Sequence, residues 1–259
     1  MTTPQTTTNR DELWVIESLR LTAFPAAPFE LRPNDWWQGV VGREPDKQVY
    51  RAGDGVRQDS GAIQLEDDHQ ALLVLNVTAL RIDWMLVAPP ISSIETIGSI
   101  PSIGAPTVGI PRFQQLMREW LQRGDAPPLC RLAFGAVFLR SVPDLPAAYE
   151  LLAPLVPWTP EPEATDFLLQ INHPRPSRVE PAVTINRLSK WQTATMDFIA
   201  LVPGTPRLIP ERRDVVARIE ADLSSDAGRS EEIPGDLVVD LLGEMAEEIS
   251  EGTTRGPRR

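Results

Sequence analysis

The sequence is poor in the residues on which many catalytic and metal sites depend. Its 259 residues include one cysteine, Cys130, and two histidines, His69 and His173, which lie far apart in the chain. One cysteine cannot form an internal disulfide, so a reducing compartment fits the composition. Metal centres need several His, Cys or carboxylate ligands brought together. We therefore expect no metal site and no cofactor.

Long apolar runs are also absent. No stretch of about 18 uninterrupted apolar residues occurs, so no membrane span is predicted. The polar start MTTPQTTTNRDE lacks the apolar segment of a signal peptide. These two absences favour a cytoplasmic protein. The sequence also lacks a G-x-S-x-G elbow, a phosphate-binding P-loop and an H-E-x-x-H zinc motif.

Clustered positive charge is missing as well. The formal net charge is −11, and the pair Arg212-Arg213 is flanked by Glu211 and Asp214. A protein that binds duplex DNA non-specifically needs clustered cations to displace counterions, so binding of nucleic acid is disfavoured. The 25 basic residues include two lysines, and the chain has 26 prolines. This bias towards arginine and proline favours a GC-rich bacterial source.

What the sequence does contain is a regular alternation of apolar segments. Apolar alternation and β-branched residues predict strands at 13–24, 61–65, 71–77, 79–87, 129–139, 166–172, 182–188 and 190–199. Helical spacing predicts helices at 32–42, 111–123, 144–155 and 234–252. Residues 214–223 fit a strand or a helix, and the strand is favoured.

The predicted elements follow the same order twice: a strand, a short helix, several strands and a long helix. We therefore expect an α+β fold of two pseudo-repeated halves, residues 11–124 and 125–251. Each half is expected to form an antiparallel sheet with a short and a long helix on one face. Residues 1–10 predict a disordered arm, and residues 252–259 predict a disordered tail. A single irregular α+β domain is the alternative.

Strand alternation also predicts a polar surface. In TDFLLQIN, residues Phe167, Leu169 and Ile171 point one way and Gln170 and Asn172 the other. The next strand and the first half of the chain show the same separation of apolar from polar side chains. The predicted polar sheet face comprises Asn76, Arg81, Asp83, Gln170, Asn172, Thr184, Asn186 and Arg187. Amides and arginines suit recognition of a partner; the alternative is a face that is only hydrated.

The segment 88–110 is an unusual connection because it is rich in isoleucine and broken by proline and glycine. Connections of this length are uncommon unless they are functional or disordered, and disordered segments are seldom so apolar. We expect either an irregular loop packed over the sheet, an apolar ligand site or an arm that docks on another subunit. The residues of this predicted interaction loop are Ile91, Ile94, Ile97, Ile100 and Ile103.

The C-terminal helix is strongly acidic. Its carboxylates recur at three- and four-residue spacing with no cation between them, which opposes helix formation. Packing of its apolar stripe must therefore hold the helix in place. A hydrated acidic face and recognition of a basic partner are both open. The acidic residues in and before this helix are Glu231, Glu232, Asp236, Asp240, Glu244, Glu247, Glu248 and Glu251.

These features favour a non-enzymatic interaction or scaffold protein of a bacterial multi-protein cytoplasmic complex. Its partner is expected to be another protein or a second copy of the chain. The alternative is a metal-dependent hydrolase or nuclease-like enzyme that uses carboxylates such as Asp166, Glu220 and Asp222, although no signature spacing supports it. His173 and Ser177 lie close in sequence, but no motif joins them into a catalytic pair.

Overall fold

The computed structural model describes residues 14–50, 57–66, 69–89, 100–157, 161, 164–201 and 208–255. The strands are β1 (Val15–Pro25), β2 (Lys47–Tyr50), β3 (Arg57–Glu66), β4 (His69–Val77), β5 (Ile82–Val87), β6 (Leu129–Val142), β7 (Leu168–Asn172), β8 (Arg175–Pro176), β9 (Thr184–Leu201) and β10 (Leu208–Ser225). The helices are α1 (Pro33–Val41), α2 (Pro106–Leu121), α3 (Leu145–Leu152), the short 3₁₀ turn η3 (Ala153–Leu155) and α4 (Gly235–Arg255).

In this described part of the chain, all strands join one ten-stranded sheet. Its order is β2-β3-β4-β5-β1-β6-β10-β9-β7, and β8 also pairs with β9. Neighbouring strands are antiparallel. The predicted α+β class and antiparallel sheet are therefore confirmed. The sheet runs without a break across the predicted boundary at residues 124 and 125, because β1 pairs directly with β6.

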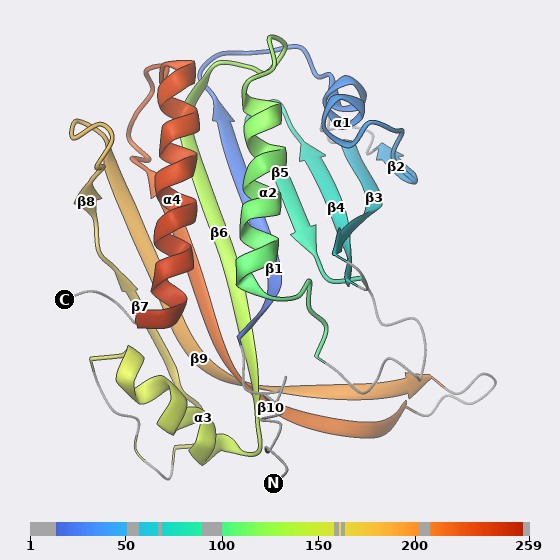
Figure 1. Cartoon of the computed structure of the whole chain (residues 1–259), viewed down its shortest axis with the longest axis vertical. Helices are drawn as coiled ribbons and strands as arrows, with labels where there is room; N and C mark the ends of the chain where they lie inside the picture. The colour runs from blue at the N-terminus through green and yellow to red at the C-terminus, as the bar shows by residue number, and fades with distance from the viewer. Residues whose placement is uncertain are drawn as a thin grey trace, which may run out of the picture.

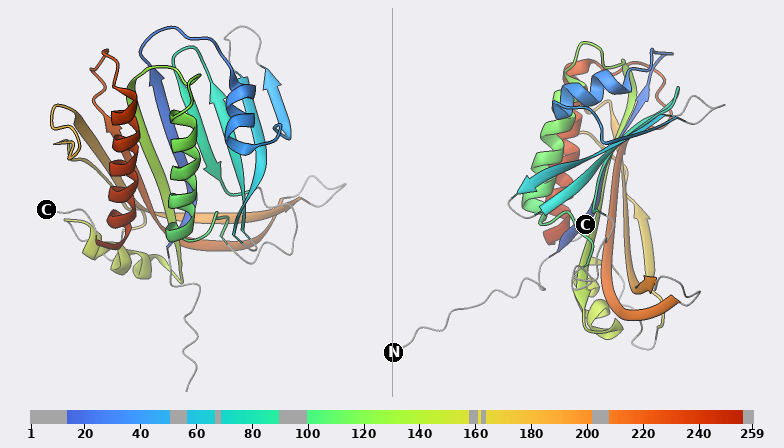
Figure 2. Two further views of the ribbon diagram at one scale, coloured as in Figure 1. Left: turned by 45° about the horizontal axis from the view of Figure 1, so that its top comes forward. Right: turned by 90° about the vertical axis from the view of Figure 1, so that its right-hand side faces the viewer.

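The hydrophobic core lies between this sheet and the helices α1, α2 and α4, which cover the same face (Figures 1 and 2). On β1, alternation points Leu19, Leu21 and Ala23 into this core, where all three are buried. Helices α2 and α4 lie side by side over β1, β6 and β10 (Figure 1). The short helix α3 lies at one end of the sheet, against β9 and β10.

Four tryptophans fix the first helices to the sheet. Trp36 and Trp37 of α1, Trp84 of β5 and Trp120 of α2 are fully buried. Ring centroids lie 6.0 Å apart for the pair Trp37 and Trp84 and for the pair Trp84 and Trp120. Such aromatic pairs bury large areas and have preferred geometries, so they set how α1 and α2 sit on the sheet.

The helix ends follow local sequence signals in part. Asp144 caps α3 as its position suggests, since its Oδ1 accepts a hydrogen bond from the Ala147 amide at 2.9 Å. Helix α2 begins at Pro106, ahead of the predicted start at residue 111, and Pro111 lies inside it. Helix α4 continues to Arg255, past the start of the predicted tail. The predicted arm 1–10 and residues 256–259 lie outside the described residues.

The hairpin of β9 and β10 is longer than the sequence suggests. The predicted strands 182–188 and 190–199 are one continuous strand, and residues 214–223 belong to its antiparallel partner. The half of this hairpin nearest its tip bends out of the main sheet and runs crosswise below it (Figures 1 and 2). Among the described helices, none is long and apolar enough to cross a membrane.

Candidate functional site

The sheet face opposite α1, α2 and α4 is not covered by any helix of the described chain (Figure 2). We call it the open face. Alternation points Ser18, Arg20 and Thr22 of β1 onto it, between the buried residues that point into the core. The registers of β1, β6 and β10 place Arg20, Gly135 and Asp222 in one row across this face.

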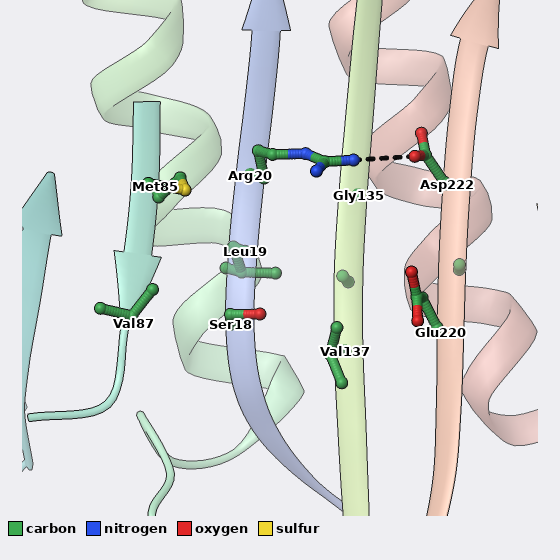
Figure 3. Close-up of a pocket in the computed structure, with 11 residues that line it drawn as sticks. Ser18, Leu19, Arg20, Met85, Val87, Gly135, Val137, Glu220 and Asp222 are labelled. Carbon is green, nitrogen blue, oxygen red and sulfur yellow. Dashed lines mark hydrogen bonds and ion pairs between the residues drawn. The ribbon is translucent and has the colours of Figure 1, made fainter. Parts of the chain in front are cut away.

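An ion pair bridges the centre of the open face. The Arg20 guanidinium donates through Nη2 to Asp222 Oδ2 at 2.8 Å, and to do so it crosses β6 at Gly135 (Figure 3). The two side chains are 40% and 28% exposed, so solvent reaches both. Burial raises the pKa of the Asp222 carboxyl, while the charge of Arg20 lowers it and that of Glu220 raises it further.

A hollow with a volume of about 140 Å³ lies beside this ion pair. Its apolar walls include Met85, Val87 and Val137, and its polar rim carries Arg20, Glu220 and Asp222 (Figure 3). Gly135 is one of its lining residues and lies beside the ion pair (Figure 3). Because Gly135, between Arg20 and Asp222 in this row, has no side chain, the Arg20 guanidinium can lie across β6 and reach Asp222 at the edge of the hollow.

Other charged groups on the open face pair with one another. On β5, Asp83 accepts a hydrogen bond from Thr22 Oγ1 at 2.6 Å and pairs with Arg81 Nε at 2.7 Å. On β10, Arg218 pairs with Glu220 at 2.9 Å and with Glu17 at 3.3 Å. These contacts fix the orientation of the donors and acceptors on this face.

The predicted polar residues other than Arg187 lie on the open face in two groups. Asn76 faces Asp83 across β4 and β5, and Asn172 Nδ2 donates to Asn186 Oδ1 at 3.4 Å across β7 and β9. Strands β5 and β9 are four steps apart in the sheet, which separates the groups by about 19 Å. The structure therefore does not bring the groups together; Arg20, Gly135 and Asp222 lie between them.

The rest of the second group extends towards the sheet edge. Gln170 is exposed and lies opposite Lys190 of β9, and Thr184 is half-buried opposite Pro176 of β8. The face as a whole is less polar than predicted, because Met85, Val87 and Val137 point onto it as well.

Arg187 is the predicted polar-face residue whose placement differs from the expectation. It shares strand parity with Ile185, which is fully buried in the core, so its side chain points to the helix-covered face. There its guanidinium forms an ion pair with Glu248 of α4. Grouping it with Asn186 was therefore wrong, since adjacent residues of a strand point to opposite faces.

The predicted interaction loop is described in part. Ile91, Ile94 and Ile97 lie outside the described residues. Ile100 is half-buried, and Ile103 is 1% exposed and belongs to the core. The Ile103 amide donates to the carbonyl of Ile16 at 2.8 Å, which holds this end of the segment along β1. Ile103 is therefore packed inside its own chain and is not available to a partner.

The acidic helix finds basic groups within the chain. Glu244 of α4 is buried and accepts from Ser177 Oγ at 2.5 Å and from the Arg178 amide at 2.9 Å, and it pairs with Arg175 at 2.7 Å. Arg175 also pairs with Glu248. This cluster ties α4 to the β8 and β9 edge of the sheet. It also holds the Ser177 hydroxyl in a buried hydrogen bond, so Ser177 is not placed as a nucleophile.

The carboxylates of the enzyme alternative are not gathered. Asp222 and Glu220 lie on neighbouring rows of β10, whereas Asp166 is exposed just before β7. Within the described residues, no group of three or more His, Cys, Asp and Glu side chains is placed to hold a metal ion. The geometry assembled around Gly135 offers hydrogen-bond donors, acceptors and an apolar wall.

Gly135 is the central residue that sequence reasoning missed. A lone glycine inside the apolar strand LCRLAFGAVFLR was a usable signal, since such a glycine often marks a close approach of another group. Arg20 gave no signal of its own, because its partner Asp222 lies 202 residues away in sequence. No family model and no curated protein matches this chain.

The fold does not require glycine at position 135. Among the described residues, the glycines with positive φ are Gly42 and Gly104. A Cβ at Gly135 would meet the Ala221 carbonyl at 3.5 Å and Arg20 Nη2 at 3.7 Å, which are ordinary contacts. We expect Gly135→Ala to raise the free energy of unfolding by about 0.5–1 kcal/mol, because glycine weakens strand interiors. Urea denaturation checks this; a loss of stability would contradict it.

Proposed function

We propose that this protein is a non-enzymatic interaction protein of a bacterial multi-protein cytoplasmic complex, and that a partner polypeptide binds its open face. The observation that carries the proposal is Gly135. A glycine that weakens its strand, and that alanine could replace without a clash, lets the Arg20 guanidinium cross β6 to Asp222 beside the hollow of the helix-free face. Glycine in a strand interior commonly accompanies the close approach of a ligand or another backbone.

The size and chemistry of the hollow support one inserted side chain. A buried cavity of about 150 Å³ accepts benzene, so about 140 Å³ suits an aromatic or branched aliphatic side chain. Met85, Val87 and Val137 would contact that side chain, and Arg20 and Asp222 would hydrogen-bond the backbone beside it. An apolar anchor within a polar rim is the usual arrangement of a protein interface.

The pairing of charges on the face also supports recognition over catalysis. General acid and base groups need positions where a proton can move to or from a substrate. On the open face, Arg218 and Lys190 both contact Glu220, and Arg20 contacts Asp222. Such fixed pairs present a defined pattern of donors and acceptors, which gives a partner specificity and register.

We further infer that the two halves of the chain are a duplication in element order. The sheet order supports this: β1 lies beside β5, the strand that precedes α2, and β6 lies beside β10, the strand that precedes α4. The antiparallel pair of β1 and β6 then marks an approximate two-fold axis. The hollow at Gly135 lies where the two halves meet.

The experiment that tests the proposal is quantitative co-purification of the full chain from its native host. Gly135→Leu places a large side chain against the ion pair of Arg20 and Asp222 at the edge of the hollow, whereas Gly124→Leu makes the same change in an exposed turn with nothing within 4 Å. We expect Gly135→Leu to reduce the amount of specific partner at least about tenfold and Gly124→Leu to leave it unchanged. Equal recovery with both variants contradicts the proposal. A metal-dependent hydrolase or nuclease activity that Asp222→Asn abolishes would also overturn it, in favour of the enzyme alternative.

A further inference from the structure

Strand β7 forms one edge of the sheet. The strand order ends at β7, which pairs on one side with β9 (Figure 1). In the described part of the chain no other strand pairs with its second side. An edge of this kind presents unpaired backbone groups to which another strand can add.

The register shows which backbone groups point outward. The Thr193 amide donates to the Phe167 carbonyl at 3.2 Å, and the His173 amide donates to the Arg187 carbonyl at 3.1 Å. The odd-numbered residues of β7 are therefore those that hydrogen-bond to β9, since bonded pairs alternate along an antiparallel ladder. The amides and carbonyls of Leu168, Gln170 and Asn172 consequently point away from the sheet.

The two edges of the sheet differ in how well they are protected against pairing with a strand of another chain. Strand β2, at the opposite edge, carries Lys47, and its Gln48 donates to Asn34 of α1 at 2.7 Å. A lysine on an edge strand is a common device against pairing with another chain. Strand β7 has the sequence LLQIN, without a charge or a proline, and Leu168 is 61% exposed. This edge lacks the usual protection.

We propose that a second copy of this chain pairs with β7 in an antiparallel arrangement, about a two-fold axis at Gln170. Each outward-facing residue then meets another: Gln170 meets Gln170 of the second copy, and Leu168 meets its Asn172. On the helix-covered side, Leu169 meets Ile171 of the second copy. The strand is thus complementary to itself in backbone hydrogen bonding, its apolar Leu169 meets an apolar Ile171, and no like charges are opposed.

The first test is sedimentation velocity of the full chain over a concentration series. The unchanged protein is expected to form a dimer. Gln170→Pro removes an outward amide that β9 does not use, and proline is tolerated on an edge strand when its nitrogen faces solvent. We expect this variant to fold and to remain monomeric. An unchanged protein that is monomeric at every concentration, or a folded Gln170→Pro dimer, overturns the proposal.

A charge exchange keeps the test decisive if Gln170→Pro does not fold. Gln170→Glu places its carboxylate opposite Lys190 within the chain but opposite a second carboxylate across the two-fold axis. We expect its dimer dissociation constant to rise about fivefold or more, and an equimolar mixture with Gln170→Lys to restore dimers. Gln192→Glu adds the same charge on β9, away from the edge, and is expected to leave the dimer intact. Absence of rescue in the mixture contradicts the proposed pairing.

Discussion

Glu244→Ala is expected to lower the free energy of unfolding by about 3–5 kcal/mol, because it leaves buried polar groups without their partner. The Glu244 side chain is 2% exposed. Its loss removes the acceptor of the Ser177 hydroxyl and of the Arg178 amide, and it removes one partner of the Arg175 guanidinium. Urea denaturation followed by circular dichroism measures the change.

Glu247→Ala is the matched control. Glu247 lies on the same helix and pairs with Arg178 at 2.8 Å, but its side chain is 59% exposed. Exposed ion pairs contribute little to stability, so the expected loss is below about 1 kcal/mol. Similar losses in the two variants would mean that the buried cluster does not hold α4 to the sheet edge.

Acid is expected to destabilise the protein through the same carboxylate. Burial alone raises the pKa of Glu244, but the hydrogen bonds from Ser177, the Arg178 amide and Arg175 lower it from 4.5 to about 2. Because the folded-state pKa is the lower one, the unfolded chain binds this proton first. The contribution of the ionised Glu244 side chain to the free energy of unfolding is full above pH 4.5 and is lost as the pH falls towards 2. Its size is about 3 kcal/mol.

The measurement is the free energy of unfolding at stepped pH values for the unchanged protein and for Glu244→Gln. The difference between them is expected to shrink by about 3 kcal/mol between pH 5 and pH 2. Asp222 acts with the opposite sign, because burial raises its pKa. Its effect is common to both proteins and cancels in the difference. A difference that does not change with pH would rule out Glu244 as the titrating group.

Local signals in the sequence were sufficient for the helices and for strand parity, but β2 and β8 were not predicted and β9 was predicted as two strands. Alternation placed Gln170, Asn172 and Asn186 on one face, and the structure has all three there. The same rule places Arg187 on the other face, and the structure has it there, paired with Glu248 of α4. On the acidic helix, Glu244, Glu247 and Glu248 form ion pairs with arginines of the same chain.

Long-range pairing could not be predicted from the residues. Arg20 meets Asp222 only because β1, β6 and β10 are adjacent in the sheet, and nothing in the local sequence sets that order. The hollow depends on the same order, since its lining residues come from the adjacent strands β5, β1, β6 and β10. The core position of Ile103 depends on its hydrogen bond to β1, which the loop composition does not reveal.

The most direct test of the central claim is hydroxyl-radical footprinting of the protein with its co-purified partner. Met85 lines the hollow on the open face, and Leu237 of α4 is a partly exposed residue on the helix side. If the open face binds the partner, oxidation of Met85 is expected to slow several-fold in the complex while that of Leu237 stays the same. Unchanged oxidation of Met85, with protection confined to the helix side, would contradict the account.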